Sequence, residues 1–301
     1  MKNWGGKWTE EKLDAFEKYV KAYLTIMNNC RDAYGWKLLY FDGFAGSGTR
    51  TPEDIVDNQE AHNLFEQEVS IDDLKVYQGA ADRVVKIESD KVRSFDHYYF
   101  VDNNKENCEL LNERLSQYEI KGRRHHLNYD ANDAVRMLSR TLRGNSNCKA
   151  LVLLDPFGMQ INWDSIVSLK GLSVDLWILV PTGVIVNRLL ERKIDKEKGL
   201  AHAKKLTSFF GMTEDEIQKF FYTETTEQTL FGDDEVMMTK AGNSIRRIAK
   251  LYVQQLKQVF PHVTEEPLVL YNTTNVPIYH LIFAAKNGTA MKIAQEIIKK
   301  K

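Results

Sequence analysis

The chain has 301 residues, 43% of them hydrophobic, which is enough for one sizeable core. Its formal net charge is −1, so no overall field draws it to nucleic acid, and a nucleic-acid surface would have to be a local patch. No apolar run approaches the roughly 20 residues that span a bilayer, and residues 1–6 lack the apolar core of a signal peptide. The three cysteines, Cys30, Cys108 and Cys148, are too far apart to predict a disulfide framework or a metal site. We therefore expect a cytoplasmic location, with no membrane and no metal.

The first predicted element is an N-terminal helical extension, residues 1–36. Thr9 can cap a helix whose first turn carries Glu10 and Glu11, and the acids complement the positive end of the helix dipole. Apolar residues follow at three- and four-residue spacing and predict one buried face: Leu13, Phe16, Val20, Tyr23, Leu24 and Met27. We expect this helix to pack against the sheet.

The next stretch predicts a ligand site. A short apolar run, residues 38–41, ends at Asp42 and passes into glycine-rich chain with Gly43, Gly46 and Gly48. A buried parallel strand is a near-continuous apolar run, and glycines let the backbone turn tightly or approach a ligand. An acid at the strand tip before such a turn indicates a nucleoside-containing ligand at the carboxyl edge of a parallel sheet. An ordinary glycine-rich turn is the alternative.

The segment after this turn is unusually long. Residues 51–79 are polar and acidic, and the next acid at a strand end is Asp102. In a plain strand–turn–helix–strand unit that acid would follow Asp42 after about 20 residues. We therefore predict an inserted flap at 50–80 beside the ligand, because long loops in compact domains are often functional. A solvated excursion is the alternative.

The remaining chain alternates between predicted strands and helices. Predicted strands cover 98–102, 125–129, 150–155 and 174–180, with helices over 80–89, 106–118, 134–142 and from an N-cap at Asp164. A helix at 245–256 precedes a strand pair at 267–271 and 278–285, and a helix at 290–300 closes the chain. This alternation predicts an α/β fold with a mostly parallel sheet and helices on both faces.

A helical elaboration is predicted at 183–262, before the C-terminal hairpin, and it is locally basic. A nucleic-acid partner could bind the cluster of Arg188, Arg192, Lys193, Lys204 and Lys205. The neighbouring aromatic pair Phe209–Phe210 could stack bases. The alternative is a solvated helix face above a phenylalanine core.

The motif Asp42-Gly43-Phe44-Ala45-Gly46-Ser47-Gly48 resembles the first motif of class I S-adenosylmethionine-dependent methyltransferases. More narrowly, nearly the whole chain is similar to the three-Cys-motif partner (TcmP) proteins. Their motifs match Phe44–Gly48, Asp155–Gly158 with Trp163, Asp175–Thr182 and Pro277–Ala284; the long segment 51–79 departs from the pattern. The resemblance implies one domain, 1–301, with a Rossmann-like seven-stranded methyltransferase fold. It also implies a companion protein that carries three cysteines and resembles radical S-adenosylmethionine enzymes.

The resemblance implies S-adenosylmethionine as the cofactor. Asp42 would accept a hydrogen bond from its amino group, Asp102 from its ribose hydroxyls and Asp130 from its adenine amino group, while the glycine backbone approaches its methionine part. The full predicted cofactor set is Asp42, Gly43, Phe44, Ala45, Gly46, Gly48, Asp102, Asn103, Asp130 and Ala131. Helix capping is the alternative for Asp102 and Asp130.

Asp155-Pro156-Phe157-Gly158 is the predicted catalytic motif. It resembles the [DNS]-P-P-[YFW] signature of methyltransferases that act on amino nitrogens of bases. By this resemblance Asp155 would orient the acceptor amine and Phe157 would stack on the base. The second proline of the signature is replaced here, which puts the register of the carbonyl and the ring in doubt. A simple strand-to-helix turn is the alternative.

These features predict a methyltransferase, an enzyme that methylates an amino nitrogen of a nucleic-acid base or nucleoside. The alternative is a non-catalytic or weakly catalytic partner that uses the fold as a scaffold for the three-Cys companion. A nucleotide-dependent dehydrogenase is disfavoured, because Asp102 is too distant and Gly48 is not followed by the further glycine or alanine of that fingerprint.

Overall fold

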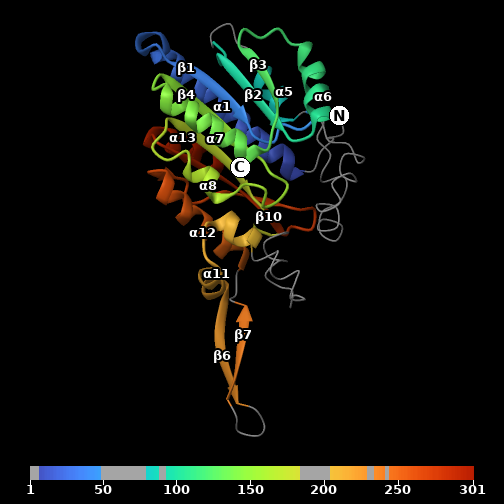
Figure 1. Ribbon diagram of the computed structural model, residues 1–301, viewed down its shortest axis with the longest axis vertical. Helices are drawn as coiled ribbons and strands as arrows, with labels where there is room; N and C mark the ends of the chain where they lie inside the picture. The colour runs from blue at the N-terminus through green and yellow to red at the C-terminus, as the bar shows by residue number, and fades with distance from the viewer. Residues whose placement is uncertain (1–6, 49–78, 88–92, 184–203, 229–233, 241–243) are drawn as a thin grey trace.

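The computed structural model describes residues 7–48, 79–87, 93–183, 204–228, 234–240 and 244–301. An eight-stranded sheet forms its centre (Figure 1), in the order β3-β2-β1-β4-β5-β10-β8, with β9 also paired to β10. The strands are β1 (Lys37–Asp42), β2 (His97–Asp102), β3 (Arg123–Asn128), β4 (Cys148–Leu154), β5 (Val174–Val180), β8 (His262–Val263), β9 (Leu268–Tyr271) and β10 (Pro277–Ala285). Strands β1 to β5 pair in parallel, and β10 runs antiparallel to β5. The predicted α/β fold with a mostly parallel sheet is confirmed.

The predicted count of seven strands is wrong, because the last edge of the sheet is broken in two. Both β8 and β9 lie along the same edge of β10, with Val263 level with Ala284 and Leu268 level with Leu281. Pro267 lies just before β9, and proline cannot donate a hydrogen bond to a strand ladder. Thr264 bridges the break, since its backbone N–H donates to the Phe283 carbonyl and its hydroxyl accepts from the Phe283 N–H.

Helices cover both faces of the sheet. One face carries α1 (Lys7–Tyr34), α5 (Ala80–Val85), α6 (Lys105–Ser116) and α13 (Gly288–Lys299); the other carries α7 (Ala131–Gly144), α8 (Trp163–Val167) and α12 (Ser244–Val259) (Figure 1). A hydrophobic core lies on each face of the sheet, and alternate residues of a strand point into one or the other. On β1, Leu38 and Tyr40 face α1, while Leu39 and Phe41 face the other helical layer. Because both faces are buried, the parallel strands read as continuous apolar runs.

Two helix boundaries differ from what the sequence indicates. Helix α1 continues past Met27, the last residue of its predicted apolar face, and ends at Tyr34, after which the chain turns at Gly35 with a φ of +61°. The N-cap position of α8 holds Asn162, so the expectation that Asp164 caps this helix is wrong. Asp164 lies instead in the first turn, where its charge still complements the helix dipole.

The region expected to be entirely helical, 183–262, also contains strands. After α11 (Glu214–Phe221), strands β6 (Tyr222–Gln228) and β7 (Asp234–Lys240) form an antiparallel pair that projects from the body of the molecule (Figure 1). The threonine-rich composition of β6 favours a strand. Among the residues described, no helix is long and apolar enough to cross a membrane.

We predict that Thr264→Val lowers the free energy of unfolding by about 1–3 kcal/mol, because the buried Phe283 N–H loses its acceptor. Thr264→Ser retains the hydroxyl and is the matched control. Urea denaturation of both variants measures the difference. Equal stability of Thr264→Val and Thr264→Ser would show that the side chain does not bridge the break.

Candidate functional site

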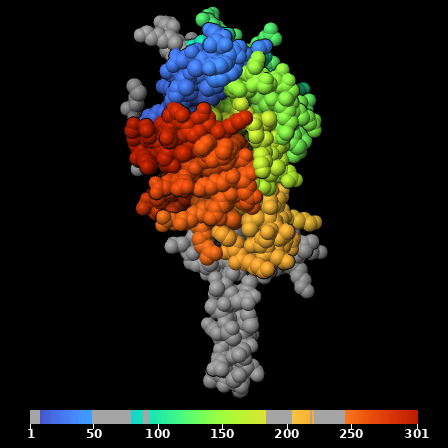
Figure 2. Space-filling model, turned by 90° about the vertical axis from the view of Figure 1, so that its left-hand side faces the viewer, coloured from blue at the N-terminus to red at the C-terminus, as the bar shows by residue number. Residues whose placement is uncertain are grey.

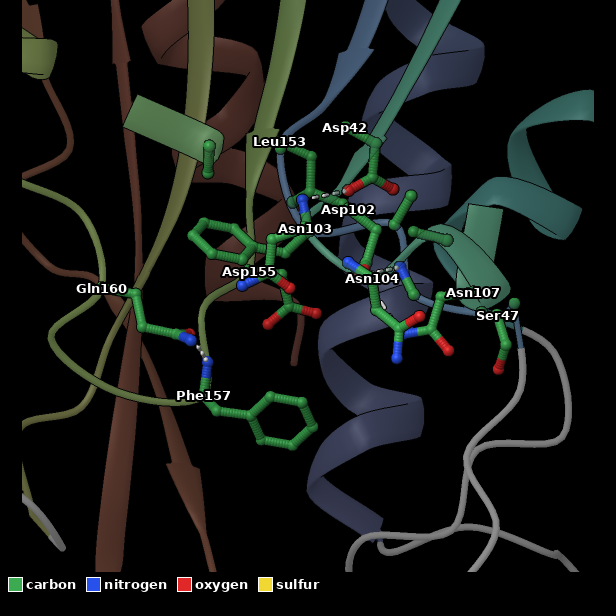
Figure 3. Close-up of a pocket in the computed structure, with 18 of the residues that line it drawn as sticks. Asp42, Ser47, Asp102, Asn103, Asn104, Asn107, Leu153, Asp155, Phe157 and Gln160 are labelled. Atoms are coloured by element: carbon green, nitrogen blue, oxygen red, sulfur yellow. Dashed lines mark hydrogen bonds between the residues drawn. The ribbon is translucent and has the colours of Figure 1, made fainter. Parts of the chain in front are cut away.

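A cavity of about 590 Å³ lies at the carboxyl edge of the sheet, beside the tips of β1 and β4 (Figure 3). The strand order reverses between these two strands, which is where open α/β sheets bind their ligands. All the sequence-predicted site residues line the cavity except Pro156 and Gly158. The cavity lining also includes Lys205 of the predicted basic patch. The predictions missed the other lining residues: Thr9, Lys12, Leu13, Ser47, Gly79, Ala80, Asn104, Asn107, Leu153, Met159 and Gln160.

The glycine turn after β1 is anchored to both neighbouring strands. The Gly43 N–H donates to the Leu153 carbonyl at 3.0 Å, and the Ala45 N–H donates to the Val101 carbonyl at 2.9 Å. Gly46 has a φ of +60°, a conformation that L-residues rarely adopt, and no heavy atom lies within 4 Å of the position a Cβ would take. The turn therefore presents bare backbone to an open cavity, which suits close approach of a ligand.

Asp42 is a buried acid at the tip of β1, with only 2% of its surface exposed. One carboxylate oxygen accepts from the Phe44 N–H and the other from the Tyr40 hydroxyl, each at 3.2 Å. Burial raises the pKa of Asp42 to about 7, and the nearby carboxylate of Asp155 adds to this rise. A cationic group in the cavity would offset the cost of keeping this acid ionised.

Asp102 organises the second strand tip. Its carboxylate accepts from the N–H groups of Gly46 at 3.2 Å and Asn104 at 2.8 Å, and from the side chain of Asn107 at 3.1 Å. The capping alternative for Asp102 is wrong, because Asn104 caps α6. Asp102 instead joins the glycine turn to the loop after β2, and Asn103, Asn104 and Asn107 add amide groups beside it (Figure 3).

Asp130 does cap a helix. Its carboxylate accepts from the N–H groups of Asn132 and Asp133 at the start of α7. The side chain remains exposed and lines the cavity together with Ala131. Capping and ligand contact are therefore compatible at this position, since a carboxylate has about four lone-pair sites.

Asp155 forms a buried ion pair that sequence reasoning missed. The Lys12 ammonium of α1 lies 2.5 Å from Asp155 Oδ2, and the lysine side chain is only 3% exposed. The same ammonium lies 5.3 Å from the centre of the Trp8 ring. Lys12 directly precedes the apolar stripe that begins at Leu13, so nothing in its local sequence distinguishes it from a solvated helix residue.

The loop that follows Asp155 is fixed from two sides. The Phe157 N–H donates to the Gln160 side chain at 3.1 Å (Figure 3), and the Phe157 carbonyl accepts from the Tyr279 hydroxyl at 3.2 Å. Trp8 stacks on Tyr279 with ring centres 5.1 Å apart. Helix α1 and strand β10 therefore hold the Asp155–Phe157 segment at the cavity wall.

The predicted basic patch is only partly described. Lys204 and Lys205 are exposed at the start of a helical stretch, 204–210, and Lys205 lines the cavity. Arg188, Arg192, Lys193 and nearly all of the predicted flap, 49–78, lie outside the described residues. Base stacking by Phe209 and Phe210 is ruled out, because both side chains are buried in the core against Tyr252. In the described part of the chain no group of three or more acids, histidines or cysteines could hold a metal ion.

No protein-family model matches the chain. A comparison with curated proteins gives no match either. Among solved structures, the chain is similar to protein LPL1258 from Legionella pneumophila, which is described under the family model DUF519. The TM-score is 0.39 at 11% sequence identity, over 96% of this chain and 91% of that one. So distant a likeness carries no argument about function.

We predict that Asp42→Asn stabilises the protein at alkaline pH. The carboxyl titrates near 3.8 when unfolded and near 7 when folded, so between these values the folded state alone holds the proton. The free energy of unfolding therefore falls as pH rises from 4 to 7, by an amount on the order of 4 kcal/mol. The Asp42→Asn variant has no carboxyl to titrate at this position, so its free energy of unfolding should not fall in this way.

Urea denaturation at pH 4.5 and pH 8 measures the effect. The variant should exceed the native chain in stability at pH 8 and match it more closely at pH 4.5. A stability difference that is the same at both pH values would contradict the raised pKa of Asp42.

Proposed function

We propose that the protein is an S-adenosylmethionine-dependent methyltransferase with a class I methyltransferase fold, acting on an amino nitrogen of a nucleic-acid base or nucleoside. The observation that carries the proposal is that one cavity at the strand-order reversal gathers the glycine turn, the buried acid Asp42, Asp102 and the Asp155–Phe157 segment. Five parallel strands followed by the antiparallel strands β8, β9 and β10 support the proposal, although the sheet has one strand more than the resemblance implies.

The residues at hand fit this cofactor. Asp42, a buried carboxyl that forms no ion pair among the described residues, lines the same cavity as the bare backbone of Gly46, which suits an amino acid ammonium and its carboxylate. Asp102, Asn103 and Asp130 supply acceptors and amides further along the cavity for ribose and adenine. When bound, S-adenosylmethionine supplies an electrophilic methyl group.

The chain's own task is to align the acceptor, since methyl transfer depends on in-line approach of the nucleophile. Lys12 bonds to Oδ2 of Asp155 and thereby orients the carboxylate, and the other oxygen can accept a hydrogen bond from the acceptor amine. Phe157, fixed through its backbone at both ends, would stack on the base. The exposed Lys204 and Lys205 could contact phosphate.

Cofactor binding should depend on pH through Asp42. The cofactor ammonium needs the ionised carboxylate, so the affinity for S-adenosylmethionine should fall by about tenfold per pH unit below about 7. 5′-Methylthioadenosine lacks the amino acid part and should show a nearly flat profile. Calorimetric titrations at pH 5.5, 6.5 and 7.5 measure both. No binding to the native chain, or undiminished binding to Asp42→Ala, would refute the cofactor assignment.

Asp155→Ala leaves the buried Lys12 ammonium without its carboxylate, so circular dichroism first establishes that the variant is folded. The folded variant should retain cofactor affinity and lose methyl transfer by about a hundredfold or more, because the acceptor amine loses its orienting group. Mass spectrometry of nucleic acids from cells with the native chain, with the variant and without the protein measures the product. Asp164→Ala, which removes an exposed acid of α8, is the matched control and should keep full activity. A methylated base at native levels in Asp155→Ala cells would refute this role for Asp155.

The Lys12–Asp155 pair also favours a second candidate function. Asp155, the residue proposed to orient the acceptor, is already bonded to the Lys12 ammonium. A non-catalytic scaffold could retain this ion pair for stability alone. In that case the protein would support a three-Cys-motif companion. Co-purification of such a companion with a chain that binds no S-adenosylmethionine would favour the scaffold over the enzyme.

A further inference from the structure

A second cavity, of about 550 Å³, lies at the opposite edge of the sheet. It opens between α1, the start of α13 and the first residues of β4 and β5, and it shares no lining residue with the first cavity. Figure 2 looks onto this side of the molecule, where α1 (blue) lies next to α13 (red). Its walls are mainly apolar and aromatic: Tyr19, Tyr23, Ile26, Met27, Trp36 and Ile293.

The inner end of this cavity carries an acid, Asp175 of β5. The Tyr19 hydroxyl donates to Asp175 Oδ2 at 2.7 Å, and among the described residues no cation pairs with this carboxylate. Burial raises the pKa of Asp175 to about 6. The Tyr23 hydroxyl beside it is buried and has no hydrogen-bond partner in the described part of the chain. Both groups would gain from a hydrogen-bonding cation.

The outer end carries two lysines. On β4, Leu151 lies level with Asp175, and Lys149 is two residues before Leu151. On β10, Ala285 lies level with Asp175, and Lys286 directly follows Ala285. Their ammonium groups donate only to uncharged oxygens, at 3.1–3.2 Å, and neither pairs with a carboxylate among the residues described. Burial and the neighbouring Lys286 lower the pKa of Lys149.

The N-terminus of α13 meets the same end, with Gly288 and Thr289 in the cavity lining. The positive end of a helix favours an anion, as do two lysines that form no ion pair with a described carboxylate. The cavity thus offers an acid, positive charge near it and apolar walls beside both, which together complement a zwitterion with an apolar side chain.

We propose that this second cavity binds a small zwitterion of the apolar amino acid class, with its ammonium on Asp175, its carboxylate towards Lys149 and Lys286, and its side chain against the aromatic wall. The Tyr23 hydroxyl accepts a second hydrogen bond from the ammonium. This site is independent of the proposed methyltransferase function, because the two cavities lie at opposite edges of the sheet.

Three probes that share one body test the proposal: phenylalanine, 2-phenylethylamine and 3-phenylpropionate. Phenylalanine should bind at least about tenfold more tightly than either singly charged probe, because only phenylalanine carries both an ammonium for Asp175 and a carboxylate for the two lysines. Calorimetry or ligand-observed NMR on the full chain measures the three affinities. Absence of phenylalanine binding, or equal affinity for phenylalanine and a singly charged probe, would overturn the proposal.

Variants locate the site. Asp175→Asn keeps an acceptor for Tyr19 and should weaken phenylalanine binding by at least about fivefold, as should Lys286→Met. Ala290→Phe fills the cavity from α13, leaves every polar group in place and should abolish binding. Asp164→Asn, at an exposed acid of α8 that lines neither cavity, is the control and should leave phenylalanine binding unchanged. Unchanged binding in folded Ala290→Phe would overturn the site even if Asp175→Asn failed to fold.

Discussion

The buried ion pair between Lys12 and Asp155 is the constraint on which the carboxyl-edge cavity depends. Removing an ammonium from water costs several kcal/mol, and the cost is repaid only if the partner charge stays in place. Helix α1 must therefore be held in one position along the sheet. Arg83 of α5 does this from outside through ion pairs with Glu10 and Asp14, and Tyr19 does it from inside through Asp175.

Three acids on the central strands have similar surroundings; they lie at the tips of β1 and β4 and near the start of β5. Asp42 and Asp155 are buried and Asp175 is half-buried, and each accepts from a donor on the α1 side of the sheet: Tyr40 for Asp42, Lys12 for Asp155 and Tyr19 for Asp175. Burial raises the pKa of Asp42 and of Asp175, so these acids oppose stability at neutral pH. Apolar residues would pack at these positions without that cost, and such exceptions to core rules concentrate at functional sites.

The parallel strands and the acids at their tips could be predicted from local sequence patterns. Apolar runs and glycine turns fixed the parallel strands and brought the acids at their tips to one edge, because the carboxyl ends of parallel strands meet there. The ion pair could not be found this way, since Lys12 and Asp155 are 143 residues apart and only the docking of α1 joins them. Strand β6 was missed because the prediction extended the helical pattern of the neighbouring segments across it, although its threonines favour a strand. The buried Phe209 was misjudged because composition alone does not separate a core aromatic residue from one that stacks on a base.

Helix α1 also connects the two edges of the sheet. Lys12 reaches the carboxyl-edge cavity, while Tyr19 and Tyr23 line the cavity at the other edge, seven and eleven residues further along the helix. At 1.5 Å per residue these positions are roughly 10–16 Å apart on one rigid element. A shift of α1 along its axis would therefore move the Lys12 ammonium from Asp155 and the Tyr19 hydroxyl from Asp175 together. The buried Lys12–Asp155 pair and the part-buried Tyr19–Asp175 hydrogen bond therefore fix the helix register jointly.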